Sequence, residues 1–294
     1  MTILMPYLAG ANHALAADTA TIQEGDVYIL SHAYETSSKS SDGSTGSSGG
    51  QTALIQRIVS IRSDGWVVEY DLPPETSEDA RMWQWQFPFS VFRPHSGEWQ
   101  LLGSEELIQR RDAWLASAEI PGEACGTYFF TWNAFKIECD LQSAIAIAKD
   151  YDTGLCEFGE GYSLDLPLIV GKLILESVNS GGDGPDLSGQ ADIAADAVRQ
   201  SRAESDVISA QILGEELSLS EAMGRRSQET IAGTMTANIW IDENACLLKQ
   251  VTASEVIITD VNSVTETRTA TYTLTREPIS VPENQATPSS ASSP

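Results

Sequence analysis

The chain has 294 residues, of which 41% are hydrophobic and 20% are charged, and its formal net charge is −25. This length and apolar content are enough for a substantial core, in one large domain or in two small ones. The acidic excess repels phosphate backbones, and no segment is apolar over the length that spans a bilayer, so we expect neither a nucleic-acid partner nor an integral membrane protein.

Residues 1–16 have the pattern of an export signal that lacks its basic start. Residues 3–11 form a short apolar run, and residues 14–16 fit a small–x–small cleavage site. The first basic side chain is Lys39, and a start codon upstream of Met1 would supply the missing basic region. The alternative is an ordinary Ala-rich N-terminus. We expect a signal-peptide remnant and a periplasmic or secreted mature protein.

The first part of the mature chain, residues 25–102, is predicted to be β-rich. Strands rich in β-branched and aromatic residues are predicted at residues 25–36, 52–62, 66–72 and 98–102. Residues 37–50 are a Ser/Gly run without core-forming side chains, which predicts a flexible loop or a hairpin tip.

Residues 82–92 are predicted to form a strand with one aromatic face. Four rings recur with a period of two, at Trp83, Trp85, Phe87 and Phe89. Pro88 would place this strand at an edge or a bulge. The rings either fill the core or line a ligand site.

A helical insert is predicted over residues 104–152. Ser104 would cap a helix over 105–118, and Asp140 would cap a second helix over 141–151. Between them, Cys125 and Cys139 flank a hairpin whose tip would lie near Trp132.

The four cysteines are predicted to form two disulfide bonds, because their number is even and the chain is expected to be exported. We favour Cys125–Cys139 and Cys156–Cys246 among the three pairings. The first bond would contribute about 3 kcal/mol to stability in the chain-entropy model. The alternative is four buried thiols in a reducing compartment.

Residues 168–275 are predicted to return to β-rich structure. Strands are expected at 168–178 and 206–213, a Gly/Asp loop at 179–189, a helix at 193–204, and a short helix from Ser218 or Ser220 to Thr230. The clearest pattern is a three-stranded meander at residues 234–241, 247–259 and 264–275. In its last strand, Ala270, Tyr272 and Leu274 share the core side and a row of threonines faces outward. Residues 278–294 are expected to be a disordered tail.

This order predicts a single α+β domain over residues 17–277: a curved, half-barrel-like antiparallel sheet with helices packed on one face. The sequence CGTYFFTWNAFKIECD at residues 125–140 resembles uncharacterised exported bacterial proteins with no assigned activity, and residues 233–275 resemble them more loosely. The strand order is also similar to the half-barrel with a helical plug of periplasmic lipoprotein carriers. Neither resemblance implies catalytic residues.

The sequence carries few chemical motifs. Residues 46–50 match G-x-S-x-G, but they lie in the Ser/Gly run and lead into a strand, which is the wrong context for a nucleophile elbow. Residues 181–186 match part of a calcium-binding repeat, which leaves a weak calcium option at Asp183 and Asp186. No zinc spacing or nucleotide-binding glycine pattern occurs, so we expect no cofactor.

Two functions fit these patterns. The first is a non-catalytic envelope protein that binds a lipid, an acyl chain or a protein partner, with candidate lining residues Trp83, Trp85, Phe130 and Trp132. The alternative is an exported hydrolase whose acidic or serine site is assembled from distant parts of the chain.

Overall fold

The structure is a computed structural model that describes residues 22–130, 134–152, 161–166, 168–178, 184–243 and 245–279. The strands are β1 (Val27–Ser40), β2 (Thr45–Arg62), β3 (Gly65–Asp71), β4 (Phe89–Pro94), β5 (Gln100–Leu102), β6 (Tyr128–Phe130), β7 (Ala134–Lys136), β8 (Ser163–Leu164), β9 (Leu173–Ile174), β10 (Glu176–Ser177), β11 (Leu187–Asp192), β12 (Thr230–Ile241), β13 (Leu247–Thr259) and β14 (Thr265–Pro278). The helices are α1 (Glu78–Met82), α2 (Ser104–Ser117), the 3-10 turn η1 (Gly122–Ala124), α3 (Gln142–Asp150), α4 (Ala195–Leu213) and α5 (Leu219–Arg226).

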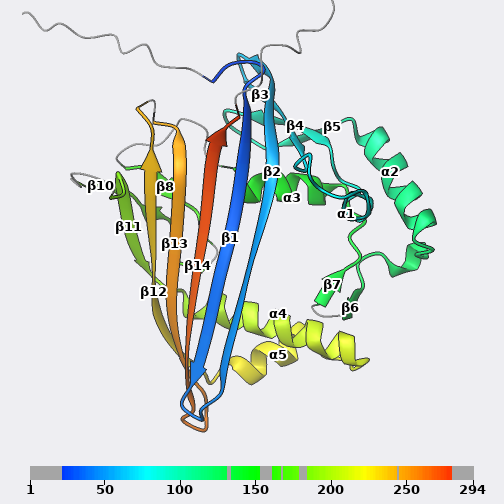
Figure 1. Ribbon diagram of the computed structural model, residues 1–294. Helices are drawn as coiled ribbons and strands as arrows, with labels where there is room; N and C mark the ends of the chain where they lie inside the picture. Colours follow the sequence, from blue (N-terminus) through cyan, green and yellow to red (C-terminus); the bar gives the residue numbers. More distant parts are fainter. Residues whose placement is uncertain are drawn as a thin grey trace, which may run out of the picture.

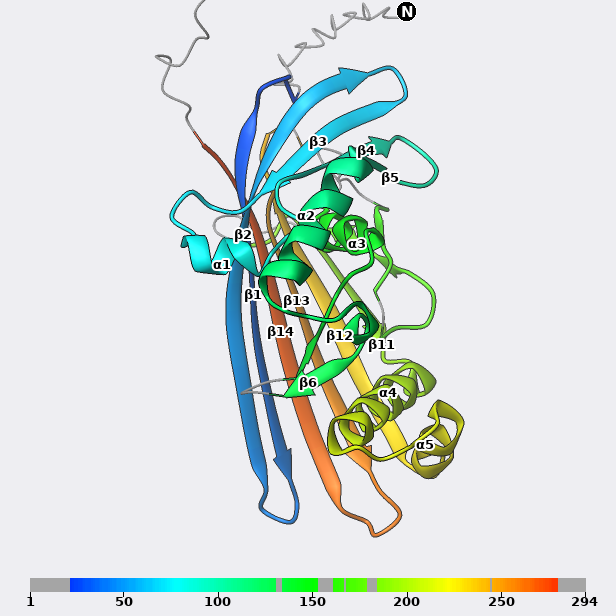
Figure 2. The same cartoon turned by 90° about the vertical axis from the view of Figure 1, so that its right-hand side faces the viewer.

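Ten strands form one antiparallel sheet in the order β10-β11-β12-β13-β14-β1-β2-β3-β4-β5. The sheet is open, with β10 and β5 at its two edges. Figures 1 and 2 show α2 to α5 on the same side of this sheet, with α3 toward one end. Helices α4 and α5 lie toward the other end, where the β1–β2 and β13–β14 hairpins turn. The predicted class, an α+β fold with an antiparallel sheet and helices on one face, is confirmed.

The two ends of the chain meet in the middle of the sheet. Strand β1 pairs with β14 from Tyr28 opposite Pro278 to Ser40 opposite Glu266. The predicted meander is confirmed as β12, β13 and β14; β13 has the predicted bounds, whereas β12 and β14 are longer than expected. The N-terminal strands and the meander therefore share one inner face, which is the face that the helices cover.

The Ser/Gly run is strand rather than loop over most of its length. Residues 37–40 belong to β1 and residues 45–50 to β2, and only residues 41–44 form the turn between them. A β-ladder is made by backbone groups, so these small side chains do not prevent pairing once β14 supplies a neighbour for β1. The part of the prediction that placed a hairpin tip in this run is confirmed.

The predicted aromatic strand at 82–92 is wrong in its first half. Ser77 accepts a hydrogen bond from the backbone N–H of Ala80 and starts α1, and turns follow as far as Pro88. Strand β4 begins only at Phe89. The period-two rings therefore do not share one strand face, because a short capped helix occupies the start of the segment.

The strand that was predicted at residues 206–213 is instead the second half of α4. Ala203 and Ala210 are buried two helical turns apart, and Asp206 pairs with Arg226 of α5. These tertiary contacts outweigh the weak strand preference of the segment. The helix ends at Gly214, whose φ of 75° is left-handed.

The strand that was predicted at residues 168–178 is divided. Gly171 has a φ of 76°, and beyond it lie only the two-residue strands β9 and β10. A left-handed residue interrupts extended backbone, which explains the break. In the C-terminal segment, Pro278 still belongs to β14, while residues 280–294 lie outside the described part of the chain.

Helices α2 and α3 lie where they were predicted, but their N-caps differ. Gly103, not Ser104, is the N-cap of α2 and makes no side-chain cap bond. Leu141 is the N-cap of α3, yet Asp140 still accepts a hydrogen bond from the Gln142 backbone N–H at 2.9 Å. The predicted cap at Asp140 is therefore wrong by one residue, although its carboxylate accepts a hydrogen bond from the start of the helix.

The hairpin prediction at the first cysteine pair is confirmed. Cys125 and Cys139 form a disulfide with a Cα–Cα distance of 5.5 Å, and β6 pairs with β7 between them. The predicted tip at Trp132 and the second predicted bond, through Cys156, fall on residues outside the described part of the chain. The Cys156–Cys246 pairing therefore stays a prediction.

Candidate ligand cavity

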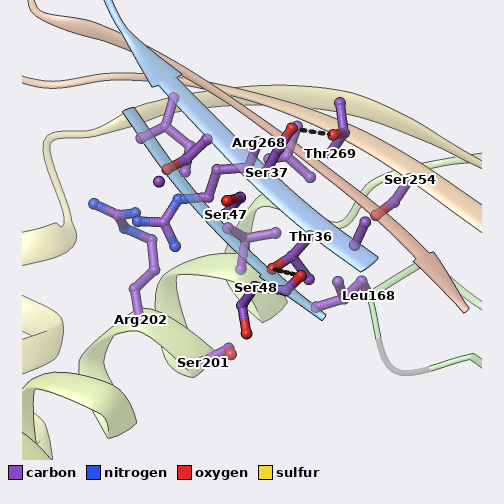
Figure 3. Close-up of a pocket in the computed structure, with 16 residues that line it drawn as sticks. Thr36, Ser37, Ser47, Ser48, Leu168, Ser201, Arg202, Ser254, Arg268 and Thr269 are labelled. Atoms are coloured by element: carbon purple, nitrogen blue, oxygen red, sulfur yellow. Dashed lines mark hydrogen bonds between the residues drawn. The ribbon is translucent and has the colours of Figure 1, made fainter. Parts of the chain in front are cut away.

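A cavity of about 460 Å³ lies between the inner face of the sheet and α4 (Figure 3). Its volume is within the range of small-molecule sites in proteins. The sheet side is lined mainly by small residues, among them Thr36, Ser38, Gly46, Ser48, Ser254 and Ala270. The helix side is supplied by α4 and the segment that precedes β9.

The strand register brings these small residues together. Thr36 lies opposite Ser48 on β2 and opposite Ala270 on β14, and Ala270 lies opposite Ser254 on β13. One row across four strands thus carries no side chain larger than threonine. Small side chains leave space above a sheet, and the side chains of α4 do not fill the space above this row.

Part of the cavity lining is apolar. Val256 and Ile258 of β13 face Val198 of α4, and Leu168 lies at the edge of the same space. All but Leu168 are buried. Because Val198, Val256 and Ile258 are already largely shielded from water, a ligand would gain hydrophobic free energy only from the small area that they still expose.

Two arginines lie together at one end of the cavity. Arg268 donates from Nε to Glu266 at 2.8 Å, and Arg202 of α4 reaches the same carboxylate at 3.3 Å. Figure 3 shows both arginine side chains at the same end of the lining. The cavity is therefore amphipathic: its apolar residue Val256 lies opposite Arg268 on the neighbouring strand.

The arginine pair belongs to a longer chain of charges. Glu229 is buried and accepts hydrogen bonds from Arg202 and from Arg226. Arg226 also donates two hydrogen bonds, of 2.8 and 2.7 Å, to the carboxylate of Asp206. The hydrogen bond from Arg226 lowers the pKa of Asp206, and burial opposes that shift only in part. These bonds fix α4 and α5 beside the sheet.

Glu266 is held in its charged form. Burial alone would raise the pKa of this carboxyl group, but the hydrogen bond and charge of Arg268, together with Arg202, lower it below the ordinary value. At neutral pH the group that joins the two arginines is therefore an anion.

Two aromatic rings continue the inner face from this cavity toward α3. Tyr34 lies opposite Tyr272, and the two side chains remain 37% and 41% exposed although they are large. Gly50 lies opposite Tyr34 on β2, and a Cβ atom there would come within 2.7 Å of the Tyr34 ring. The glycine therefore leaves room for a ring to lie along the sheet.

A second cavity, of about 450 Å³, lies farther along the same strands beside α3. Thr52, Leu54 and Phe87 line it, together with Ile147 and Tyr151. Thr52 is four residues from Ser48 of the first cavity, which corresponds to about 13 Å along a strand. The inner face of the sheet thus carries two hollows, with the exposed tyrosine pair between them.

His32 is the histidine of the inner face. Its ring stacks on Tyr272 and meets the edge of Tyr151, with centroid separations of 6.0 Å in both cases. Burial raises the pKa of the neighbouring Asp150, and the charge of His32 opposes this shift. Within the described residues, no hydrogen bond joins His32 to a hydroxyl group that could act as a nucleophile.

The predicted lining residues lie in different places. Trp83 is exposed, whereas Trp85 is buried, stacks on Trp114 of α2 and donates from Nε1 to the Glu138 carbonyl at 3.0 Å. Neither tryptophan lines the two cavities described above. The side chain of Phe130 and all of Trp132 fall outside the described part of the chain.

The remaining sequence motifs do not form a catalytic or metal site among the described residues. The G-x-S-x-G match lies inside β2 and is extended throughout, so it makes no strand-to-helix turn. Asp186 accepts a hydrogen bond from the Ile241 backbone N–H at 2.9 Å, and Asp183 falls outside the described residues. Among the described residues, no three His, Cys, Asp or Glu side chains cluster as a metal site would require.

Sequence reasoning missed the arginine pair and the small-residue row. A usable signal for Arg268 existed, because it has the same parity along its strand as Ala270 and Tyr272, which were assigned to the core side. An arginine that faces the core side of a strand must be paired with an acidic group or a ligand, because burying an unpaired charge is costly. The Arg202 position had no comparable signal, because the helix predicted over residues 193–204 was assigned no buried face.

Comparisons with known proteins add little. No protein-family model matches the chain, and no curated protein sequence matches it. A solved structure described as "lipid-protein interactions in lipovitellin" is similar over 88% of this chain and 26% of its own length, with 12% sequence identity and a TM-score of 0.38. The chain therefore spans about a quarter of that protein, and a TM-score this low supports no argument about function.

Proposed function

We propose that this protein is a non-catalytic carrier that binds a ligand with an apolar chain between its sheet and its helices. The observation that carries the proposal is the cavity of about 460 Å³, in which Val198, Val256 and Ile258 form an apolar wall. An apolar ligand would be shielded from water against this wall, and the hydrophobic gain would come mainly from the ligand's own surface.

The second hollow and the tyrosine pair support an elongated ligand. An acyl chain that starts in the first cavity can extend along β1 and β2 over Tyr34 and Tyr272, whose rings are exposed on the inner face. Aromatic rings offer large apolar contact areas at a small cost in side-chain entropy.

An envelope location fits this function. The Cys125–Cys139 bond is consistent with an oxidising compartment, where disulfides form and persist. Apolar ligands must be shielded from water when they are moved between membranes. No helix in the described part of the chain is long and apolar enough to cross a bilayer.

The test is ligand capture by the protein when it is produced in a bacterial periplasm. We expect native mass spectrometry to detect co-purified lipid, and we expect the delipidated protein to increase the fluorescence of an acyl probe. The variant Ala270→Phe places a ring in the cavity and should weaken probe binding at least about tenfold.

The matched control is Ala253→Phe, which makes the same substitution on the opposite face of the sheet. Ala253 lies between Thr252 and Ser254 on β13, and Ser254 lines the cavity, so side-chain alternation directs Ala253 away from it. Equal probe binding by both variants, or no probe binding by the unmodified protein, would rule out this site.

A further inference from the structure

We propose that the ligand is anionic: a single-chain amphiphile whose carboxylate or phosphate headgroup is bound by Arg268 and Arg202 while its chain occupies the apolar wall. This inference rests on the proposed function and deepens it, because it names the chemical class of the ligand. Val256 lies opposite Arg268, and Ile258 lies opposite Glu266, so the apolar wall is directly beside the arginine pair.

Donor groups remain available at the end of the cavity where the two arginines lie. Arg268 gives its Nε to Glu266, and its two terminal nitrogens have no hydrogen bond within the described part of the chain. Arg202 already donates to Glu266 and Glu229, and its Nε is buried, so the accessible donors are mainly those of Arg268. A guanidinium with free terminal nitrogens can bind a carboxylate or a phosphate through two parallel hydrogen bonds.

Hydroxyl groups extend the polar end. Ser38 and Ser201 line the cavity with the two arginines, one from the sheet and one from α4. Hydroxyls donate to the same oxyanions that arginine binds. An anion at this end would therefore meet donors from both layers of the fold.

The cavity end is one of the few places where basic side chains gather in this acidic chain. The chain carries 42 acidic and 17 basic residues, so most of its surface repels anions. At the cavity end, Arg202 and Arg268 both pair with Glu266, and Arg202 also pairs with Glu229. Arg226 joins Glu229 to Asp206, so the three arginines and three carboxylates of this network balance in charge. A ligand anion would therefore be bound by the unbonded terminal nitrogens of Arg268 and not by an excess of positive charge.

The experiment compares dodecanoate with dodecanol, which have the same chain and differ in headgroup charge. Each is titrated against the delipidated full chain at neutral pH by displacement of a neutral fluorescent probe. We expect Arg268→Gln to weaken dodecanoate binding about tenfold and to change dodecanol binding by less than about twofold. We expect Glu266→Gln to tighten dodecanoate binding by up to about fivefold, because it removes the competing carboxylate.

The matched control is Arg57→Gln. Arg57 is 49% exposed and paired with Glu69, whereas Arg268 is 48% exposed and paired with Glu266. Arg57 lines neither cavity, so its removal should leave both ligands unaffected. Arg268→Lys keeps the charge and should retain part of the preference for dodecanoate, which separates charge from folding defects.

The outcomes separate the two proposals. If Arg268→Gln weakens dodecanoate and dodecanol equally, the headgroup assignment is overturned while the carrier function stands. If acetate or inorganic phosphate binds as tightly as dodecanoate, the site takes free anions and the amphiphile is excluded. If neither dodecyl ligand binds the unmodified chain, the carrier function itself fails and this inference fails with it.

Discussion

The two ends of the inner face are built on the same strands from side chains of very different size. Toward α3, Leu30 lies opposite Leu54, and both are buried. Toward α4, the same two strands place Thr36 opposite Ser48. On this pair of strands, Leu30 therefore packs into the core and Leu54 borders the cavity beside α3, whereas Thr36 and Ser48 line the cavity beneath α4.

This difference indicates that the cavity beneath α4 exists because the side chains on the sheet below the helix are small. Hydrogen bonds from Arg226 to Asp206 and Glu229 join α4 to α5 and to the residue that precedes β12. We expect substitutions to have effects that depend on which end they alter.

The largest expected effect is at the packed end. Leu30→Ala removes a fully buried side chain and should lower the free energy of unfolding by about 2–5 kcal/mol, because the deletion loses apolar contacts and leaves a void. Ser48→Ala at the hollow end should change it by no more than about 0.5 kcal/mol. Urea denaturation of both variants measures the contrast, and equal losses would mean that the two ends are packed alike.

The next effect concerns the charges that hold α4 in place. Asp206→Asn breaks the two-point contact with Arg226 and should lower the free energy of unfolding by about 1–2 kcal/mol at neutral pH. Asp196→Asn is the control on the same helix. Its pair with Arg199 leaves the Asp196 side chain 92% exposed, so the loss should be no more than about 0.5 kcal/mol.

This contact also predicts a pH dependence. The pKa of Asp206 is lowered in the folded protein, so the unfolded chain binds the proton more readily. The stabilisation is fully present above the ordinary pKa of 3.8 and is lost as the pH falls through the lower folded value. Asp206→Asn should reduce the steepness of acid unfolding, and an unchanged acid limb would contradict this assignment.

The smallest effect is at the cap of α5. Ser218 and Glu221 form a reciprocal capping box, and Ser218→Ala should lower the free energy of unfolding by about 1 kcal/mol or less. Ser220→Ala, two residues later in the same helix, should have almost no effect. A larger loss from Ser220 than from Ser218 in thermal unfolding would show that the helix starts later.

Local patterns predicted much of the fold. The meander, α2, α3 and the Cys125–Cys139 hairpin depend on interactions between residues that are close in the chain, and they were located from the sequence. The errors at residues 37–50 and 206–213 arose because these segments depend on neighbours that are distant in sequence. The error at residues 82–92 arose because a short capped helix occupies the start of the segment.

The candidate site could be predicted less well. Trp83 and Trp85 were chosen because their spacing is typical of one face of a strand. The segment is not a strand, because α1 and the turns after it occupy these positions. Arg268 could have been found from its parity along β14, but its position beside Arg202 depends on the packing of α4 against the sheet. No local sequence pattern predicts that Arg268 and Arg202 lie close together.

The sequence by itself determined the antiparallel meander, the alternation that separates an inner from an outer face, and the acidic surface, because these follow from side-chain period and composition. Only the tertiary structure decided that β1 pairs with β14, that α4 continues to Leu213, and that Arg202 and Arg268 share Glu266. These features join residues that lie far apart in the chain, and their energy arises only when the sheet and the helices are already assembled.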